Sequence, residues 1–180
     1  RRELGFPGDA YIVAFCGQLS HRKGVKVLSD AIDSINEGEP VHVLFIGRPE
    51  GEMPTCRNIL HCGPVAHDKV ATYLNAADIF VLPTLHEGCC NAIVEAMACG
   101  LPIVSSDRPF NHDILSADNA ILIEPTDSRQ VADAIVRLRN DKELRQRLSK
   151  GALATAQKQT LAQRATKIVE FMEERIQQKV

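Results

Sequence analysis

Hydrophobic positions along the chain follow two different periods. Six short runs are rich in apolar and β-branched residues, and most are apolar throughout, as in strands buried on both faces of a sheet. These runs cover residues 11–16, 41–46, 58–62, 79–82, 103–106 and 120–123. Several of them end at glycine or proline, which separates them from the segments that follow.

Between these runs, apolar residues recur at intervals of three and four, the spacing of an amphipathic helix. The pattern predicts helices over residues 25–35, 70–77 (with His67 or Asp68 near the start), 92–99, 131–138 (with Asp127 as N-cap) and 142–157 (broken near Gly151), and one more after Thr160. Alternating strands and helices predict a single α/β domain over residues 1–180. It should be a doubly wound, Rossmann-like parallel sheet of six strands with helices on both faces, binding its ligand at the carboxyl ends of the strands.

The most informative stretch runs from residue 86 to 107, HEGCCNAIVEAMACGLPIVSSD. Two carboxylates, Glu87 and Glu95, flank the start of a short apolar helix that begins near Asn91 and stops at Gly100. Every residue from 92 to 99 except Glu95 is apolar, so the pattern places this carboxylate in a buried helix. A buried charge must find a partner in the protein or in a ligand.

A helix N-terminus offers free backbone N–H groups and the positive end of a dipole, which suits phosphate. Carboxylates on either side accept hydrogen bonds from hydroxyl groups. A ligand with phosphate at its centre and polyols at both ends, such as a nucleotide-sugar, fits this layout. The alternative is that Glu95 pairs with a buried Arg or Lys and that Glu87 is a solvated loop residue.

Composition narrows the function classes. The formal net charge of −2 gives no sign of non-specific nucleic-acid binding or of a polybasic membrane surface. No apolar run approaches the ~20 residues of a membrane-spanning helix, and the start has no apolar signal-peptide core. The chain also lacks an initiator Met, so we expect it to be a piece of a longer protein. The six cysteines form no C-x-x-C pair and no zinc pattern, so we expect reduced thiols in a cytoplasmic protein without a metal.

The stretch around the two glutamates resembles the signature of the retaining glycosyltransferases of family 4, which have the two-lobed GT-B fold. The matching features are Glu87, seven intervening residues, Glu95 and then AMACGLPIVSSD. The resemblance extends over nearly the whole chain and implies a C-terminal donor-binding lobe. It implies transfer of a hexosyl group from a UDP- or GDP-linked sugar, with retention and without a metal, in bacterial-type polysaccharide or glycoconjugate biosynthesis.

The same resemblance implies roles for individual residues. Glu87 would be catalytic, orienting the donor sugar and stabilising positive charge at the reacting carbon, and Glu95 would accept the ribose hydroxyls. Lys23 would bind the diphosphate. Backbone groups of the donor site would come from Gly17, Gly88, Cys89, Cys90, Asn91 and Ala92, and the loop beside the base would contain Gly63 and Val65.

One position departs from the family pattern. In family 4 an Arg and a Lys of a Gly-Arg-Leu…Lys-Gly segment hold the diphosphate, and here Gln18 stands where the Arg is expected. Glutamine donates hydrogen bonds but brings no charge, so either diphosphate affinity is lower or Arg22 substitutes. For Lys23 itself, the alternative is a solvated loop lysine.

The acceptor site and any membrane contact would belong to an N-terminal lobe that this chain lacks, so the isolated domain should be inactive alone. Two other classes stay open. A GT-B-fold nucleotide-sugar epimerase lobe would need its own acid and base residues. A non-enzymatic doubly wound module of response-regulator type would need acidic residues after the first strand, where Gly17-Gln18-Leu19 supplies none.

Overall fold

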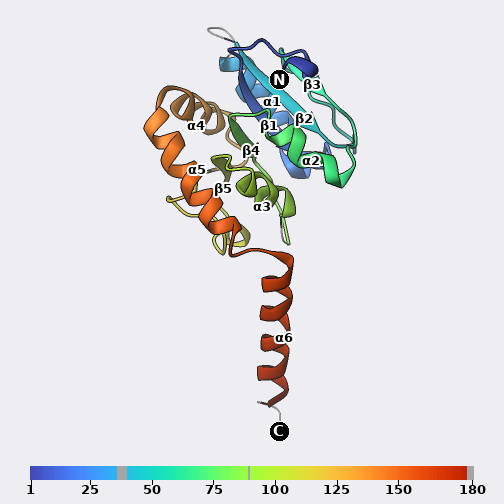
Figure 1. Cartoon of the computed structure of the whole chain (residues 1–180). Helices are drawn as coiled ribbons and strands as arrows, with labels where there is room; N and C mark the ends of the chain where they lie inside the picture. The colour runs from blue at the N-terminus through green and yellow to red at the C-terminus, as the bar shows by residue number, and fades with distance from the viewer. Residues whose placement is uncertain (36–39, 89, 178–180) are drawn as a thin grey trace.

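The computed structural model describes residues 1–35, 40–88 and 90–177 (Figure 1). Six strands form one parallel sheet, as the apolar runs predict. They are β1 (Tyr11–Cys16), β2 (Val41–Ile46), β3 (Ile59–His61), β4 (Ile79–Leu82), β5 (Ile103–Ser106) and β6 (Ala120–Ile123). Five of the six match the predicted ranges, and β3 is shorter than predicted by one residue at each end.

The strand order is β3-β2-β1-β4-β5-β6. The chain therefore starts in the middle of the sheet, builds outward to β3, and then returns to the other side of β1 with β4. This reversal makes the carboxyl ends of β1 and β4 the switch point of the sheet, which is the usual ligand position in such folds. The centre of the sheet is sealed by the fully buried rings of Phe15, Phe45 and Phe80.

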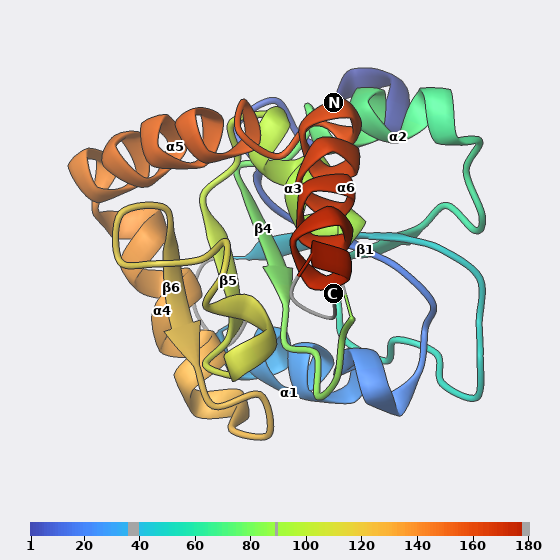
Figure 2. The same ribbon diagram turned by 90° about the horizontal axis from the view of Figure 1, so that it is seen from below.

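Helices cover both faces of the sheet, as Figure 2 shows. The helices α1 and α4 pack together on one face, and α2, α3 and α5 cover the other. Three single 3-10 turns, η1 (Arg2–Leu4), η2 (His21–Lys23) and η3 (Pro109–Asn111), complete the described structure. The helices are α1 (Val25–Ile35), α2 (His67–Leu74), α3 (Asn91–Ala98), α4 (Ser128–Asn140), α5 (Lys142–Ala156) and α6 (Leu161–Gln177).

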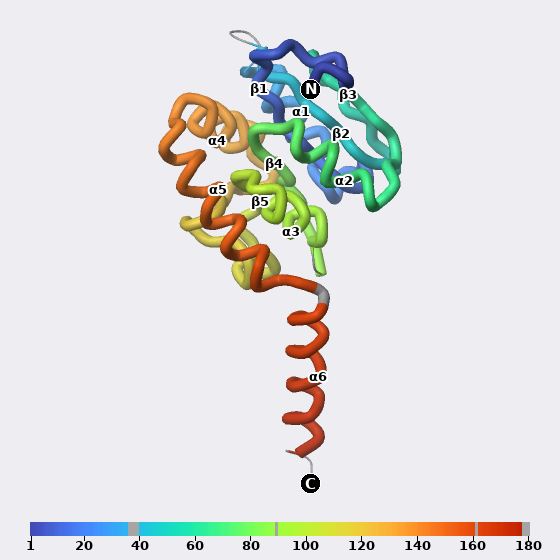
Figure 3. Tube along the Cα trace, viewed as in Figure 1, coloured from blue at the N-terminus to red at the C-terminus, as the bar shows by residue number. Residues whose placement is uncertain are grey.

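The last helix, α6, projects away from the rest of the molecule, as the traces in Figures 1 and 3 show. Its apolar side chains are therefore open to solvent: Ile168, Val169, Phe171, Met172 and Ile176 are each more than half exposed. Its root is tied to α3, since Arg164 Nη1 donates to Asn91 Oδ1 at 3.1 Å. Within the described residues, no helix is long and apolar enough to cross a membrane.

The carboxyl ends of the first strands meet through glycines. Gly17 follows β1 and Gly47 follows β2, and a Cβ on Gly47 would lie 1.8 Å from the carbonyl oxygen of Gly17. The N–H of Gly47 in turn donates to the carbonyl of Gly63, which follows β3, at 2.9 Å. Only a residue without a side chain allows the loops after β1 and β2 to approach so closely.

Two helix predictions need correction. Ala77 lies beyond the end of α2, in a turn where its N–H donates to the carbonyl of Leu74. Gly151 does not break its helix, because α5 is continuous from Lys142 to Ala156. The glycine is needed instead for packing, since a Cβ there would lie 2.0 Å from the carbonyl oxygen of Asp118.

This contact gives a prediction for stability. In an unobstructed helix, Gly→Ala usually stabilises by about 0.5–1 kcal/mol. At Gly151 the new methyl group would push the backbone of Asp118 away, so we expect Gly151→Ala to destabilise the fold by about 1–3 kcal/mol in urea denaturation. Gly8→Ala is the matched control, because no atom lies within 4 Å of its added Cβ. A stabilised Gly151→Ala variant would contradict the packing role.

Candidate functional site

The centre of the site is a buried ion pair between Lys23 and Glu87, whose side chains are each only 10% exposed. Lys23 Nζ donates to Glu87 Oε1. The same oxygen accepts from Thr84 Oγ1 at 3.0 Å and lies 3.3 Å from Arg22 Nη1. Among the described residues, no group donates to the second oxygen, Oε2, so one side of the carboxylate remains available for a ligand.

The chain brings these residues together from two strand ends. Lys23 closes the turn η2 after β1, and Gly24 follows it with a positive φ of 74°. A Cβ on Gly24 would lie 2.2 Å from the carbonyl oxygen of Pro83, so the glycine permits direct contact with the loop after β4. The N–H of Leu85 also donates to the carbonyl of Arg22 at 2.8 Å. The loops after β1 and β4 are thus one packed unit.

Arg22 connects the two loops through its side chain. Its guanidinium donates to the carbonyl of His86 at 3.0 Å and, through Nη2, to Gln18 Oε1 at 3.4 Å. Its side chain is 46% exposed, so part of the guanidinium faces solvent. Gln18 therefore lies beside a cation, although it carries no charge itself.

The start of α3 lies next to Lys23. The carbonyl of Cys90 accepts from the N–H groups of Ile93 and Val94 at 3.1 and 3.3 Å, so the helix opens with the N–H groups of Asn91 and Ala92. Burial raises the pKa of the Cys90 thiol to about 11, and the nearby Lys23 ammonium opposes this shift. The thiol is neutral at pH 7, so it adds no negative charge at the positive end of the helix.

Gly88 is exposed beside this helix start. Cys89, also predicted to bind the donor, lies outside the described residues.

Glu95 corrects the prediction of a buried carboxylate. Its side chain is 32% exposed, and among the described residues it faces the imidazole of His67 at the start of α2, with Nδ1 3.7 Å from Glu95 Oε1. The sequence left open that Glu95 pairs with a buried Arg or Lys and that Glu87 is solvated. The structure shows the opposite, because Glu87 is the enclosed residue that pairs with cations and Glu95 is partly open to solvent. Two adjoining cavities of about 440 and 340 Å³ share Glu95, His67 and Ala98 in their walls.

Lys23 and Glu95 both influence the thiol of Cys16, at the end of β1. Its pKa is raised to about 12, chiefly by burial and in addition by Glu95, while Lys23 acts to lower it. Both charged groups therefore act on the same buried atom. The loop with Gly63 and Val65 leads from β3 to α2 and His67, so it lies on the Glu95 side of the site.

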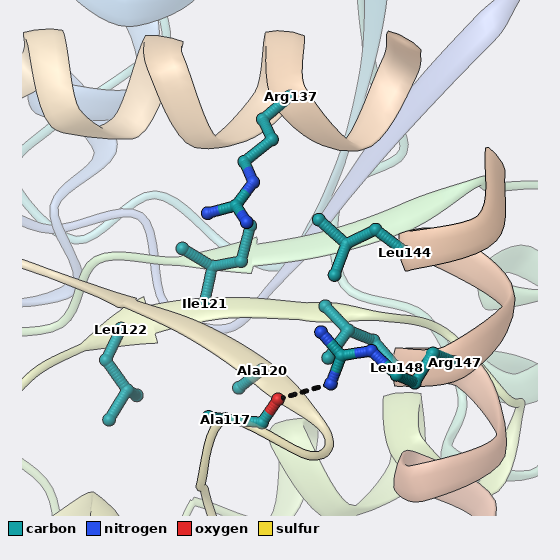
Figure 4. A pocket seen from close by; sticks show the side chains of 8 residues that line it. All are labelled: Ala117, Ala120, Ile121, Leu122, Arg137, Leu144, Arg147 and Leu148. Atoms are coloured by element: carbon teal, nitrogen blue, oxygen red, sulfur yellow. Dashed lines mark hydrogen bonds between the residues drawn. The ribbon is translucent and has the colours of Figure 1, made fainter. Parts of the chain in front are cut away.

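A different cavity, of about 280 Å³, lies away from this site (Figure 4). It lies at the amino end of the edge strand β6, whereas Glu87 and Lys23 follow the carboxyl ends of their strands. Figure 4 shows Arg137 extending from its helix towards Ile121 and Arg147 lying beside Leu148 and Ala120. Arg147 Nη1 donates to the carbonyl of Ala117 at 3.1 Å. Its lining residues are Ala117, Ala120, Ile121, Leu122, Arg137, Leu144, Arg147 and Leu148.

Sequence reasoning missed two members of the site. Thr84, fully buried, binds Glu87 through its hydroxyl, and no periodicity distinguishes it from other loop residues. His67 was predicted only as a helix start. Its position two residues beyond the predicted base-side loop was the available signal.

Comparison with known proteins agrees with this geometry. A family model described as glycosyl transferases group 1 matches residues 10–141, from the start of β1 to the end of α4. The chain belongs to the glycosyl transferases group 1 family. The match contains Lys23, Glu87 and Glu95, so these three charged groups lie within the part that defines this glycosyltransferase family.

Relatives of this glycosyltransferase family resemble the chain over most of its length. TuaC of Bacillus subtilis (strain 168), a glycosyltransferase named for teichuronic acid biosynthesis, is 31% identical over 142 residues, 78% of this chain and 36% of TuaC. Anabaena HepE, solved with UDP, superposes with a TM-score of 0.83 at 21% identity, over 97% of this chain and 51% of HepE. The C-terminal domain of the group 1 glycosyltransferase LpcC of Francisella tularensis gives a TM-score of 0.74 at 20% identity, over 88% and 89%.

These solved structures share the fold of one lobe of a GT-B glycosyltransferase. The chain spans about half or less of the full-length relatives TuaC and HepE. It matches the LpcC C-terminal domain almost end to end.

The buried ion pair gives a stability prediction. Removing one partner of a buried pair leaves the other charge poorly compensated, so Lys23→Met should cost about 2–4 kcal/mol. Lys26→Met is the matched control, because Lys26 pairs with Asp30 on the exposed surface of α1 at 2.9 Å and should cost less than about 1 kcal/mol. Urea denaturation of both variants tests this. Equal losses would show that Lys23 and Glu87 are solvated in solution.

Proposed function

We propose that this chain is the donor-binding lobe of a retaining glycosyltransferase of family 4, which transfers a hexosyl group from a UDP- or GDP-linked sugar. The observation that carries the proposal is the convergence of two cations, a helix N-terminus and two carboxylates at the carboxyl ends of β1 and β4. HepE, which has this fold, has been solved with UDP and with UDP-glucose. The cations and the helix N-terminus suit the diphosphate of a nucleotide-sugar, and the two carboxylates suit the hydroxyl groups of its sugar and ribose.

In this proposal the diphosphate lies at the start of α3. Lys23 and the N–H groups of Asn91 and Ala92 face its negative charge, with further backbone contacts from Gly17, Gly88 and Cys90. Gln18 contributes a neutral contact beside Arg22. Because Lys23 and Arg22 supply the positive charge, the donor is bound without a metal.

The nucleoside extends to the other side of the site. Glu95, open to solvent and facing His67, accepts the ribose hydroxyls, and the cavities beside it accommodate the nucleoside. The base then approaches the loop of Gly63 and Val65, which reads it through backbone groups. Backbone groups are present whatever the side chains are, so binding measurements with UDP and GDP must decide between uracil and guanine.

Glu87 acts on the sugar. Its Oε2 accepts a donor-sugar hydroxyl while Oε1 stays fixed by Thr84 and Arg22, so the carboxylate is held in one orientation. As the bond to the diphosphate breaks, positive charge develops at the reacting carbon, and a fixed carboxylate stabilises that charge without rearranging. The diphosphate oxygen leaves towards Lys23 and the N-terminus of α3.

The acceptor belongs to a second, N-terminal lobe outside this chain, together with any membrane contact. The exposed apolar stripe of α6 supports this arrangement, since it lacks a covering surface within the described residues. The reduced state of the described cysteines fits a cytoplasmic enzyme. A role in bacterial-type polysaccharide or glycoconjugate biosynthesis follows the relationship to TuaC.

Calorimetric titration with UDP and GDP tests the nucleoside assignment. At least one of them should bind the chain, and Glu95→Ala should weaken it by about 1–3 kcal/mol, because the charge-assisted hydrogen bonds to the ribose diol are lost. Glu170→Ala, on the exposed surface of α6, is the control and should bind like the parent. A folded Glu95→Ala variant with parental affinity would refute the ribose role.

The chain alone should bind donor but not transfer sugar. Without a second lobe no acceptor is held near the reacting carbon, and the proximity contribution of roughly 7–11 kcal/mol to lowering the barrier is lost. The measurement is formation of glycosylated product by this chain and by the full-length enzyme, each mixed with donors and acceptors. Equal rates would mean that these 180 residues hold the complete active site.

A further inference from the structure

The ammonium of Lys23 already has an anionic partner within the chain. Glu87 Oε1 accepts from Lys23 Nζ, the residue that the proposed function assigns to the donor diphosphate. The two side chains are equally enclosed, with 10% of each exposed, so their attraction is only partly screened by water. A diphosphate entering this site meets an ammonium that is already paired with a carboxylate.

We propose that Glu87 is the resident counter-anion of Lys23, and that the donor diphosphate must displace it from the ammonium. This inference rests on the proposed function and adds a coupling between the diphosphate and sugar halves of the donor. While Lys23 holds Glu87 Oε1, the carboxylate is a weaker acceptor for a sugar hydroxyl. Once Lys23 turns to the diphosphate, Glu87 regains that capacity.

Other contacts keep Glu87 in place during the exchange. Thr84 Oγ1 donates to the same oxygen at 3.0 Å from a fully buried position, and Arg22 Nη1 lies 3.3 Å away. Arg22 is itself fixed by the carbonyl of His86 at 3.0 Å. The carboxylate therefore loses one donor without losing its orientation, which makes Arg22 and Thr84 positioning residues for the proposed reaction.

The side chain of Lys23 has room to change partners. Gly17 leaves open the space beside it, since a Cβ built there would lie 3.6 Å from Lys23 Cε and 3.8 Å from Nζ. The ammonium also lies near the Cys90 thiol at the start of α3, whose pKa it lowers against the effect of burial. In the proposed exchange, the Lys23 side chain uses this space to turn from Glu87 towards α3.

The exchange also has a consequence for product release. After transfer the nucleoside diphosphate no longer carries the sugar that engages Glu87. The freed carboxylate then competes again for Lys23 and weakens the hold on the product. The same residue would favour the intact donor over the spent one.

Inorganic pyrophosphate tests the competition without requiring knowledge of the base or the sugar. Glu87→Gln removes the competing charge at nearly constant shape, so the variant should bind pyrophosphate at least about threefold more tightly than the parent chain in calorimetric titration. Asp30→Asn is the matched control, because it removes a carboxylate from the exposed Lys26 pair on α1. It should leave pyrophosphate affinity unchanged.

A double variant separates competition from direct binding by the new amide. If Lys23 is the group released, the double variant Lys23→Met/Glu87→Gln should lose the whole gain in pyrophosphate affinity and bind no more tightly than the parent. Circular dichroism checks that each variant is folded. Parental or weaker affinity in Glu87→Gln, or a gain that persists in the double variant, would overturn the counter-anion role. Failure of the parent to bind UDP or GDP would instead overturn the proposed function.

Discussion

The geometry of the carboxyl edge of the sheet depends on the ion pair between Lys23 and Glu87. These residues are 64 positions apart and come from loops after neighbouring strands, β1 and β4. Enclosing both charges is costly unless they meet, so the pair fixes the register of one loop against the other. Thr84 and Arg22 complete the hydrogen bonding, and Gly24 allows the contact with Pro83 that brings the loops together.

The same pair divides the site into two electrostatic halves. On one side, the Lys23–Glu87 pair is enclosed beside the backbone N–H groups that open α3. On the other, Glu95 faces an open cavity and only an exposed histidine. A ligand with a charged centre and neutral polar ends is oriented by this asymmetry before any specific hydrogen bond forms.

The strands were predictable because each is a short β-prone run, and the capping of α4 by Asp127 was predictable because a short polar side chain preceded an apolar repeat. The resemblance to family 4 assigned donor-binding roles to Glu87, Lys23 and Glu95 one by one, without their mutual contacts. Their burial was not predictable: the apolar neighbours of Glu95 along the helix indicated enclosure, but the cavity beside it is made by α2 and α5. The prediction that Gly151 breaks its helix was wrong for a related reason. The glycine is needed for close contact with Asp118, which is distant in sequence.

The projecting helix α6 is attached to the rest of the molecule at one end only, so a rotation at that end moves the whole helix. Its 17 residues give a length of about 25 Å at the standard helical rise. Its root is held beside the first residue of α3 by the hydrogen bond from Arg164 to Asn91. A tilt of about 10° at the root therefore moves the tip by about 4 Å, so a small rotation at the start of α3 becomes a larger displacement at the far end of α6.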